Sequence, residues 1–351
     1  MLRRSGMQPR VLNHLAIAAW NRASPFSSKP GPPPSSSSSG PGHEGTKELK
    51  APPRKKSISF SGQIKRARSA RDAIGVIANI ERQGYHPDVY HYSAIISKCA
   101  KEKLVKKALE FLAEMEEVGI PPNVVSYNSA ISACEKGRQP DIALSLLAQM
   151  KEEGIQRTVV SYNSAISACE KGGLKYTDTA LSLFTEMKKA GVSPNDVAYR
   201  AIIKACFDSK RYPEAMQLAR EAAGLRFKDR PIRINVSTKK GHQMWDLHDH
   251  TEATACMLLA DTLLAFVCSS KGGGAPSYQN IFVVTGKGLR TIESKDPVLR
   301  EKVPAFLNDI AGLGTTAVKR NEGIFLIAAA SLKKWVASGA SEKFKGLFQN
   351  R

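Results

Sequence analysis

The sequence predicts a mainly helical fold, an α-solenoid of stacked helix pairs that is followed by a small α/β two-layer domain. The string VVSYNSAISACEKG occupies residues 124–137 and occurs again at residues 159–172. Equivalent segments start at Val89, Val124, Val159 and Asp196, in steps of 35, 35 and 37 residues. Fixed periods of this length are typical of helical solenoids, in which each unit buries its apolar faces against its neighbours. After residue 230 the period is lost and a β-rich run, IRINVST, begins.

Each unit is expected to contain two amphipathic helices. In the second full unit, Tyr127, Ile131 and Cys134 are spaced at i, i+4 and i+7, and a second segment carries a similar apolar face. A glycine stands where each second helix should end, because glycine adopts the left-handed stop most readily. These glycines are Gly84, Gly119, Gly154 and Gly191.

The domain boundaries follow from the repeat frame. The repeat region is predicted at residues 54–230, with units 54–88 (degenerate), 89–123, 124–158, 159–195 and 196–230. An α/β domain at 231–340 and a tail at 341–351 follow. In this domain we expect strands at 232–238, 281–285, 317–320 and 323–327, and helices at 251–267, 297–310 and near the end of the chain.

The formal charge of +20 and the pI near 9.7 favour a polyanionic partner. Much of this charge is N-terminal, since residues 1–71 hold 14 Lys and Arg against Glu44 and Glu48. Residues 1–53 therefore resemble an Arg-rich transit peptide followed by a disordered Pro/Ser-rich linker, the alternative being a disordered basic tail. A transit peptide implies the mitochondrial matrix or the plastid stroma. No apolar run is long enough to span a membrane, so we expect no membrane partner.

Four cysteines recur at the eleventh position of successive units. They are Cys99, Cys134, Cys169 and Cys206. The sequence holds no CxxC pair, so this spacing indicates buried thiols of the architecture instead of a metal site.

The 35-residue unit, of the form VVxYNxxIxAxxKxGxxxxALxLLxxMxxxGI, resembles the pentatricopeptide repeat, a module of organellar single-stranded RNA-binding proteins. The resemblance covers residues 89–225 and, more weakly, 54–88. A tetratricopeptide-like protein-interaction scaffold is the alternative, although its tryptophan and glycine signature is missing.

The resemblance implies a set of base-reading residues. In the family, the fifth and last residues of a unit select the base, which here gives Ser93 with Asn123, Asn128 with Thr158, and Asn163 with Asn195. The first pair would prefer adenine and the other two pyrimidines. If a wrong base costs about 1–3 kcal/mol, three readers discriminate by about 3–9 kcal/mol, so protein cofactors or the second domain must add specificity.

Two further groups of RNA contacts follow from the same resemblance. The second residue of each unit packs against a base in the family, and the corresponding residues could equally belong to the core. They are Tyr90, Val125, Val160 and Val197. In the fourth unit Arg200 replaces the polar selector, which suggests a phosphate contact or a stacking cation instead of a defined base reader.

The second domain carries two short motifs, Trp245-Asp246-Leu247-His248 before a helix and Thr285-Gly286-Lys287-Gly288 after a strand. With the later NEGIFLI and LKKWV they resemble the small MutS-related (Smr) domain, over residues 232–338. This resemblance implies contact with RNA or its endonucleolytic cleavage.

The chemistry of these motifs suggests a phosphodiester site. In extended backbone, Asp246 and His248 share a face, where they could hold Mg²⁺ or act as acid and base. The glycines of the second motif allow close approach to a phosphate, with charge from Lys287 and Arg290. The alternatives are a structural role for Asp246 and His248 and a simple turn at residues 285–288.

Together these features predict an organellar single-stranded RNA-binding protein that acts in RNA processing or maturation. Metal-dependent endoribonuclease activity in the second domain is one version of this hypothesis. A non-catalytic RNA-stabilising factor is the other.

Overall fold

A computed structural model describes residues 53–224, 233–237, 242–247, 250–269, 278–285, 298–318 and 323–349. The chain divides into two compact units, Met1–Arg157 and Thr158–Arg351. The predicted leader and linker lie outside the described residues, apart from Pro53.

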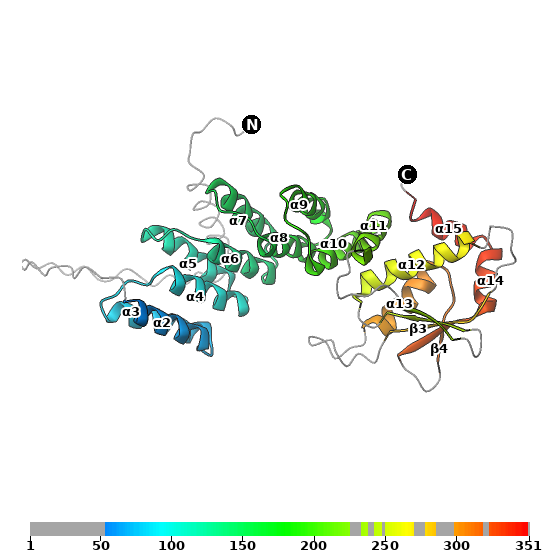
Figure 1. The fold of residues 1–351 in the computed structure, drawn as a ribbon, viewed down its shortest axis with the longest axis horizontal. Coiled ribbons are helices and arrows are strands. Elements are labelled where there is room, and N and C mark those ends of the chain that lie inside the picture. Colours follow the sequence, from blue (N-terminus) through cyan, green and yellow to red (C-terminus); the bar gives the residue numbers. More distant parts are fainter. Residues whose placement is uncertain are drawn as a thin grey trace, which may run out of the picture. The chain divides into compact units, whose positions relative to one another are not determined.

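The described part of the first unit is a series of helix pairs (Figure 1). Its helices are α2 (Arg54–Arg66), α3 (Ala70–Arg82), α4 (Val89–Lys101), α5 (Val105–Glu117), α6 (Val124–Lys136) and α7 (Pro140–Glu152). The first helices of successive pairs stack on one another, because α4 packs against both α2 and α6. The first pair, α2 and α3, occupies the segment that was predicted as a degenerate repeat.

The second unit continues with the same kind of helix pair. Its repeat helices are α8 (Val159–Gly172), α9 (Thr177–Lys189), α10 (Asp196–Asp208) and α11 (Tyr212–Gly224). The longer step after the third unit is accounted for by a short 3₁₀ turn, Leu174–Tyr176, which is entered through Gly173 at φ +95°. The turns of the pairs α4/α5, α6/α7 and α10/α11 pass through non-glycine residues at positive φ, namely Lys103, Arg138 and Lys210.

The helix ends follow the local sequence. Asp88, Asn123, Thr158 and Asn195 each cap the first helix of a pair with a side-chain oxygen that accepts a backbone N–H bond. The four predicted glycines end the second helices at φ between +69° and +78°. The residue after each glycine donates its N–H to a carbonyl five residues earlier, as Ile120 does to Met115 at 2.8 Å.

The repeat core is built from residues at equivalent positions. The predicted thiols Cys99, Cys134, Cys169 and Cys206 are all buried, as are the tyrosines Tyr92, Tyr127, Tyr162 and Tyr199. Tyrosine hydroxyls reach glutamates on the second helix of the same pair. Tyr92 donates to Glu114 at 2.7 Å, and Tyr199 donates to Glu221 at 2.7 Å.

After α11 the described chain forms a five-stranded sheet with the order β1-β2-β3-β5-β4. The strands are β1 (Arg233–Ser237), β2 (His242–Asp246), β3 (Ile281–Val284), β4 (Thr316–Ala317) and β5 (Ile324–Ile327). β2 and β3 are parallel, and the other neighbouring strands are antiparallel. The sequence interpretation assigned no strand at residues 242–246, although it expected extended backbone at Asp246.

Helices α12 (Glu252–Ser269) and α13 (Val298–Asp309) pack against each other on one side of the sheet (Figure 1). The chain then forms α14 (Ala329–Ala337) and α15 (Ala340–Gly346). The segment predicted as a tail belongs to the core instead, because Phe344 of α15 is buried and its ring centroid lies 5.7 Å from that of Trp335. Within the described residues, none of the helices has the length and apolar character that crossing a membrane requires.

Candidate nucleic-acid interface

The predicted last-position residues are all helix caps. Asn123 Oδ1 accepts from the N–H groups of Val125 and Ser126 at 2.9 and 3.0 Å. Thr158 and Asn195 cap α8 and α10 in the same way. A last-position residue is therefore fixed in orientation by the helix that begins immediately after it.

The fifth-position residues lie on the first helices, and the third of them touches a cap. The amide nitrogen of Asn163 donates to Asn195 Oδ1 at 2.9 Å, which joins the two members of one predicted base-reading pair. Asn128 is half-buried, whereas Ser93 and Asn163 are only 7% and 9% exposed. These two side chains are thus more enclosed than the sequence interpretation expected.

Both enclosed side chains keep a polar atom without a partner. Ser93 Oγ and Asn163 Oδ1 are buried and make no hydrogen bond within the protein. An unsatisfied buried polar atom costs about 1–3 kcal/mol, so its presence at equivalent positions of two repeats requires an explanation. A ligand that donates to Asn163 Oδ1 would remove this cost.

The predicted stacking residues are exposed apolar side chains. Tyr90, Val125, Val160 and Val197 have exposed fractions of 69, 57, 55 and 49%. The alternative that these residues belong to the core is therefore wrong. They occupy the second position of successive repeats, so each first helix presents one apolar side chain to solvent within a turn of its fifth-position residue.

A recurring lysine is part of the repeat pattern, but the sequence interpretation gave it no role in RNA binding. Lys101, Lys136 and Lys171 stand at the thirteenth position of three successive repeats, near the carboxyl ends of α4, α6 and α8. Lys101 and Lys171 are exposed, and Lys136 is half-buried. The signal in the sequence was the identical position, at which the fourth repeat has Asp208 instead.

Arg200, the predicted phosphate contact of the fourth repeat, is held by a carboxylate. Its Nε donates to Asp196 Oδ1 at 3.0 Å, and its Nη2 lies 2.5 Å from Asp196 Oδ2. The Arg200 side chain remains 46% exposed. The ion pair orients the guanidinium and leaves it accessible to solvent.

The two motifs of the second domain start at one edge of the sheet. Asp246 ends β2 opposite Val284 of the parallel strand β3, and the N–H of Leu247 donates to the Val284 carbonyl at 2.8 Å. Parallel strands end at the same edge, so Asp246 and Thr285 both lie at this edge of the sheet. His248, Gly286, Lys287, Gly288 and Arg290 lie outside the described residues.

The side chain of Thr285 is buried at the end of strand β3. It is 5% exposed, and its hydroxyl donates to the Gly323 carbonyl at 3.2 Å. A cleft of about 700 Å³ lies beside this edge between α13 and strands β4 and β5, and its lining includes Thr285, Arg300 and Asn308. The Thr285 hydroxyl is therefore already engaged in a hydrogen bond within the sheet.

The described residues do not assemble a Mg²⁺ site. Within them, no group of three or more His, Cys, Asp or Glu side chains is placed to hold a metal ion. Mg²⁺ is usually held by one or two carboxylates together with waters and substrate phosphates. Asp246 is described, whereas His248, the other predicted ligand, lies outside the described residues, so the Mg²⁺ site stays a prediction.

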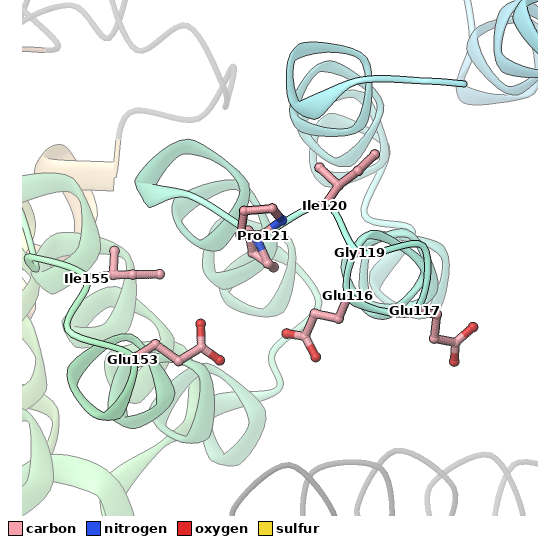
Figure 2. Close-up of a pocket in the computed structure, with 8 residues that line it drawn as sticks. Glu116, Glu117, Gly119, Ile120, Pro121, Glu153 and Ile155 are labelled. Atoms are coloured by element: carbon pink, nitrogen blue, oxygen red, sulfur yellow. The ribbon is translucent and has the colours of Figure 1, made fainter. Parts of the chain in front are cut away.

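A separate cleft of about 730 Å³ in the first unit has the wrong charge for RNA (Figure 2). It lies at the ends of α5 and α7, and its lining includes Glu116, Glu117 and Glu153. The carboxylates of Glu116 and Glu153 point into the space between these helices (Figure 2), and the Gln149 amide donates to both, at 3.3 and 2.9 Å. Phosphates would be repelled by these carboxylates.

Comparison with protein families matches residues 75–137 to a pentatricopeptide repeat domain, and residues 122–171 and 157–208 to the PPR repeat family. The matched residues, 75–208, lie within the segment that was predicted to consist of pentatricopeptide repeats. A comparison with curated proteins finds no match.

Several solved structures are similar to part of the chain. The PPR domain of Arabidopsis thaliana protein-only RNase P 1, in complex with tRNA, is 20% identical with a TM-score of 0.42, over 49% of this chain and 88% of that one. PPR10 in complex with an 18-nt psaJ RNA element is 23% identical with a TM-score of 0.41, over 46% and 24%. PPR10 from maize is 17% identical with a TM-score of 0.43, over 83% and 36%. The chain thus spans about a quarter to a third of PPR10, and TM-scores this low do not establish a shared overall arrangement.

Proposed function

We propose that this protein binds single-stranded RNA through its pentatricopeptide repeats and acts in RNA processing or maturation. The observation that carries this proposal is the contact between Asn163 and Asn195. It brings the fifth residue of one repeat onto the cap of the next, and it leaves Asn163 Oδ1 buried without a partner. A base that donates an N–H to this oxygen would satisfy it.

The surroundings of this pair suit a nucleotide. Val160 and Val197, the second-position residues of the same two repeats, are both about half exposed and can pack against base faces. Lys171 lies at the other end of α8, where it can contact the phosphate backbone. The pair thus combines a polar edge, apolar contact surface and a nearby cation.

The experiment that tests RNA binding is a salt titration of the full chain with a fluorescently labelled single-stranded RNA. If three lysines contact phosphates, the logarithm of affinity falls with a slope near –2.1 against the logarithm of salt concentration, which is about 20-fold between about 50 and 200 mM. The Lys136→Ala variant should lower this slope by about 0.7, whereas Glu117→Ala in the acidic cleft should not lower it.

A salt-independent affinity would contradict the proposal. It would favour the alternative, a protein-interaction scaffold that uses an apolar groove. The same titration with double-stranded RNA serves as a second control. The Watson–Crick edges are already paired in that form, so equally tight binding to it would contradict reading of these edges.

Endonucleolytic cleavage is a second candidate function of the domain after α11. The observation that favours it is the parallel pairing of β2 and β3. Because of this pairing, Asp246 of the first predicted motif and Thr285 of the second lie at the same edge of the sheet. Labelled RNA should be cut by the full chain, and the double variant Asp246→Ala, His248→Ala should lose this activity while it keeps RNA affinity. Equal cleavage by the variant would show that Asp246 and His248 take no part in the reaction. If neither chain cleaves the RNA, the result would favour a non-catalytic RNA-stabilising factor.

The cellular site proposed is an organelle, with the mitochondrial matrix favoured over the plastid stroma. The support is the acid-free, Arg-containing leader at residues 1–43. Import of the full chain into isolated mitochondria or plastids, followed by detection of a shortened product, tests this proposal. A chain that stays outside and unprocessed would contradict it.

A further inference from the structure

The acidic cleft at the ends of α5 and α7 takes no part in the proposed RNA binding (Figure 2). Residues of two equivalent turns line it, and in each turn a glycine at positive φ precedes an isoleucine. The N–H groups of Ile120 and Ile155 each donate to a helix carbonyl five residues earlier, both at 2.8 Å. Both turns are thus fixed before a partner arrives, which lowers the cost of ordering them on binding.

Apolar side chains form much of the lining of this cleft. Ile120 and Ile155 are half-buried, and Pro121 is exposed next to the half-buried Pro122. Proline has a fixed φ, so this wall of the cleft is rigid. The cleft has a volume of about 730 Å³, within the range of roughly 300–1,000 Å³ that is usual for binding pockets. It is therefore large enough to hold side chains of a bound peptide.

Negative charge gathers at this cleft against the electrostatic preference of a helix end. Glu116 and Glu117 stand in the last turn of α5, which has no basic residue there, and Glu153 is the cap residue at the end of α7. The carboxyl end of a helix carries a partial negative charge and favours cations, so carboxylates at this place are unfavourable. The last turn of α9, in contrast, carries Lys188 and Lys189.

The lining of the cleft supplies no positive charge of its own. The eight residues that line it include neither lysine nor arginine, and Lys151 in the last turn of α7 is exposed outside the lining. The neutral amide of Gln149 donates to Glu153 Oε1 at 2.9 Å. Among the described residues the Glu153 carboxylate makes no other hydrogen bond or ion pair, so its second oxygen remains open to a cation.

We propose that this cleft binds a basic segment of a partner protein. An arginine or lysine of the segment pairs with Glu153 in the field of the neighbouring carboxylates, and an apolar side chain beside it packs between Ile120 and Ile155. The charge of the cleft selects this partner, because RNA phosphates are repelled, and the described residues include no group of three side chains placed to hold a metal ion.

This inference goes beyond RNA binding and does not depend on it. A partner held in the cleft would add the specificity that three base readers lack, while the lysines at the thirteenth position stay available to phosphates.

The test measures binding of a short, fluorescently labelled peptide, in which arginine alternates with leucine, to the full chain without RNA. A matched peptide carries citrulline in place of arginine, which keeps the shape of the side chain and removes its charge. Fluorescence anisotropy should show binding of the arginine peptide that weakens with added salt, and no comparable binding of the citrulline peptide.

A matched pair of double variants locates the site. Glu117→Gln with Glu153→Gln should raise the Kd of the arginine peptide about 5- to 30-fold, which corresponds to about 1–2 kcal/mol for two exposed carboxylates. Glu110→Gln with Glu152→Gln removes the same charge from α5 and α7 outside the lining and should leave the Kd unchanged. The first pair should not lower the unfolding temperature, since it removes carboxylates from helix ends.

Three outcomes would overturn the proposal. Failure of the full chain to bind the arginine peptide would show that the cleft is not a site for a basic segment. Equal binding of the citrulline peptide would show that charge plays no part. An equal loss of affinity in both double variants would assign the binding to the overall charge of the protein and not to the cleft. Because no RNA is present, none of these results is affected if the chain fails to bind RNA.

Discussion

Replacing Asn163 with alanine should weaken RNA binding while the stability of the fold changes little. The variant loses the bond from Asn163 Nδ2 to Asn195, which contributes about 0.5–1.5 kcal/mol. It also loses Asn163 Oδ1, a buried acceptor without a partner, whose burial costs about 1–3 kcal/mol. These terms oppose each other, so the free energy of unfolding should fall by no more than about 0.5 kcal/mol and rise by no more than about 2.5 kcal/mol.

The effect on the complex should be larger, because only the complex gives Asn163 Oδ1 a partner. Loss of one base contact costs about 1–3 kcal/mol, which raises the Kd about 5- to 140-fold. Fluorescence anisotropy with labelled single-stranded RNA measures the Kd, and urea unfolding measures stability. Ser182→Ala, at an exposed position of α9, is the matched control and should change neither quantity.

The opposite pattern would contradict base reading by Asn163. If Asn163→Ala kept full RNA affinity and lost several kcal/mol of stability, Asn163 would be a core residue of the repeat and not a base reader. The caps themselves are less suitable targets. Asn195→Ala would remove the cap of α10 together with the base contact, so the two effects could not be separated.

Three further outcomes are expected from the structure. Tyr90→Ala should lower RNA affinity by about 1–3 kcal/mol without loss of stability, because this ring is exposed, and comparison of anisotropy with thermal unfolding checks both. Tyr92→Phe should destabilise the protein by about 1–3 kcal/mol in urea unfolding, since it removes the 2.7 Å hydrogen bond to Glu114. Burial raises the pKa of Cys134 from 9.0 to about 12, so its contribution to stability should be complete below pH 9 and should fall as the pH rises toward 12. The loss should be about 1.4 kcal/mol per pH unit, and Cys134→Ala should flatten this part of the stability profile by that amount.

The repeat helices were predictable because each helix depends on local signals. A polar cap such as Asn123, the apolar spacing that begins with Tyr127 and a terminal glycine such as Gly154 suffice to place both helices of a unit. The second domain was less predictable. Residues 242–246 form strand β2 because they pair with β1 and β3. Phe344 is buried because it packs against aromatic rings outside its own short helix, such as that of Trp335, and the sequence of this helix does not predict that contact.

The sequence predicted which repeat positions belong to the candidate site, but it did not predict how exposed their side chains are. The resemblance to the pentatricopeptide repeat singled out Ser93 and Asn163, but their enclosure depends on the packing of neighbouring helices, which a single repeat does not encode. The exposure of Val160 could not be distinguished from burial, because valine is common in both settings. The lysines at the thirteenth position recur visibly when the repeats are aligned, but lysine is ordinarily exposed on any helix, so its recurrence alone does not indicate a phosphate contact.

The most direct test of the account is the affinity of the full chain for RNAs that present every combination of three consecutive nucleotides in a single-stranded context. The account predicts a preference for adenine followed by two pyrimidines, with Asn163→Ala relaxing the choice at the third nucleotide only. Binding without preference, or a preference that Asn163→Ala changes at another position, would contradict the assignment of successive repeats to successive bases.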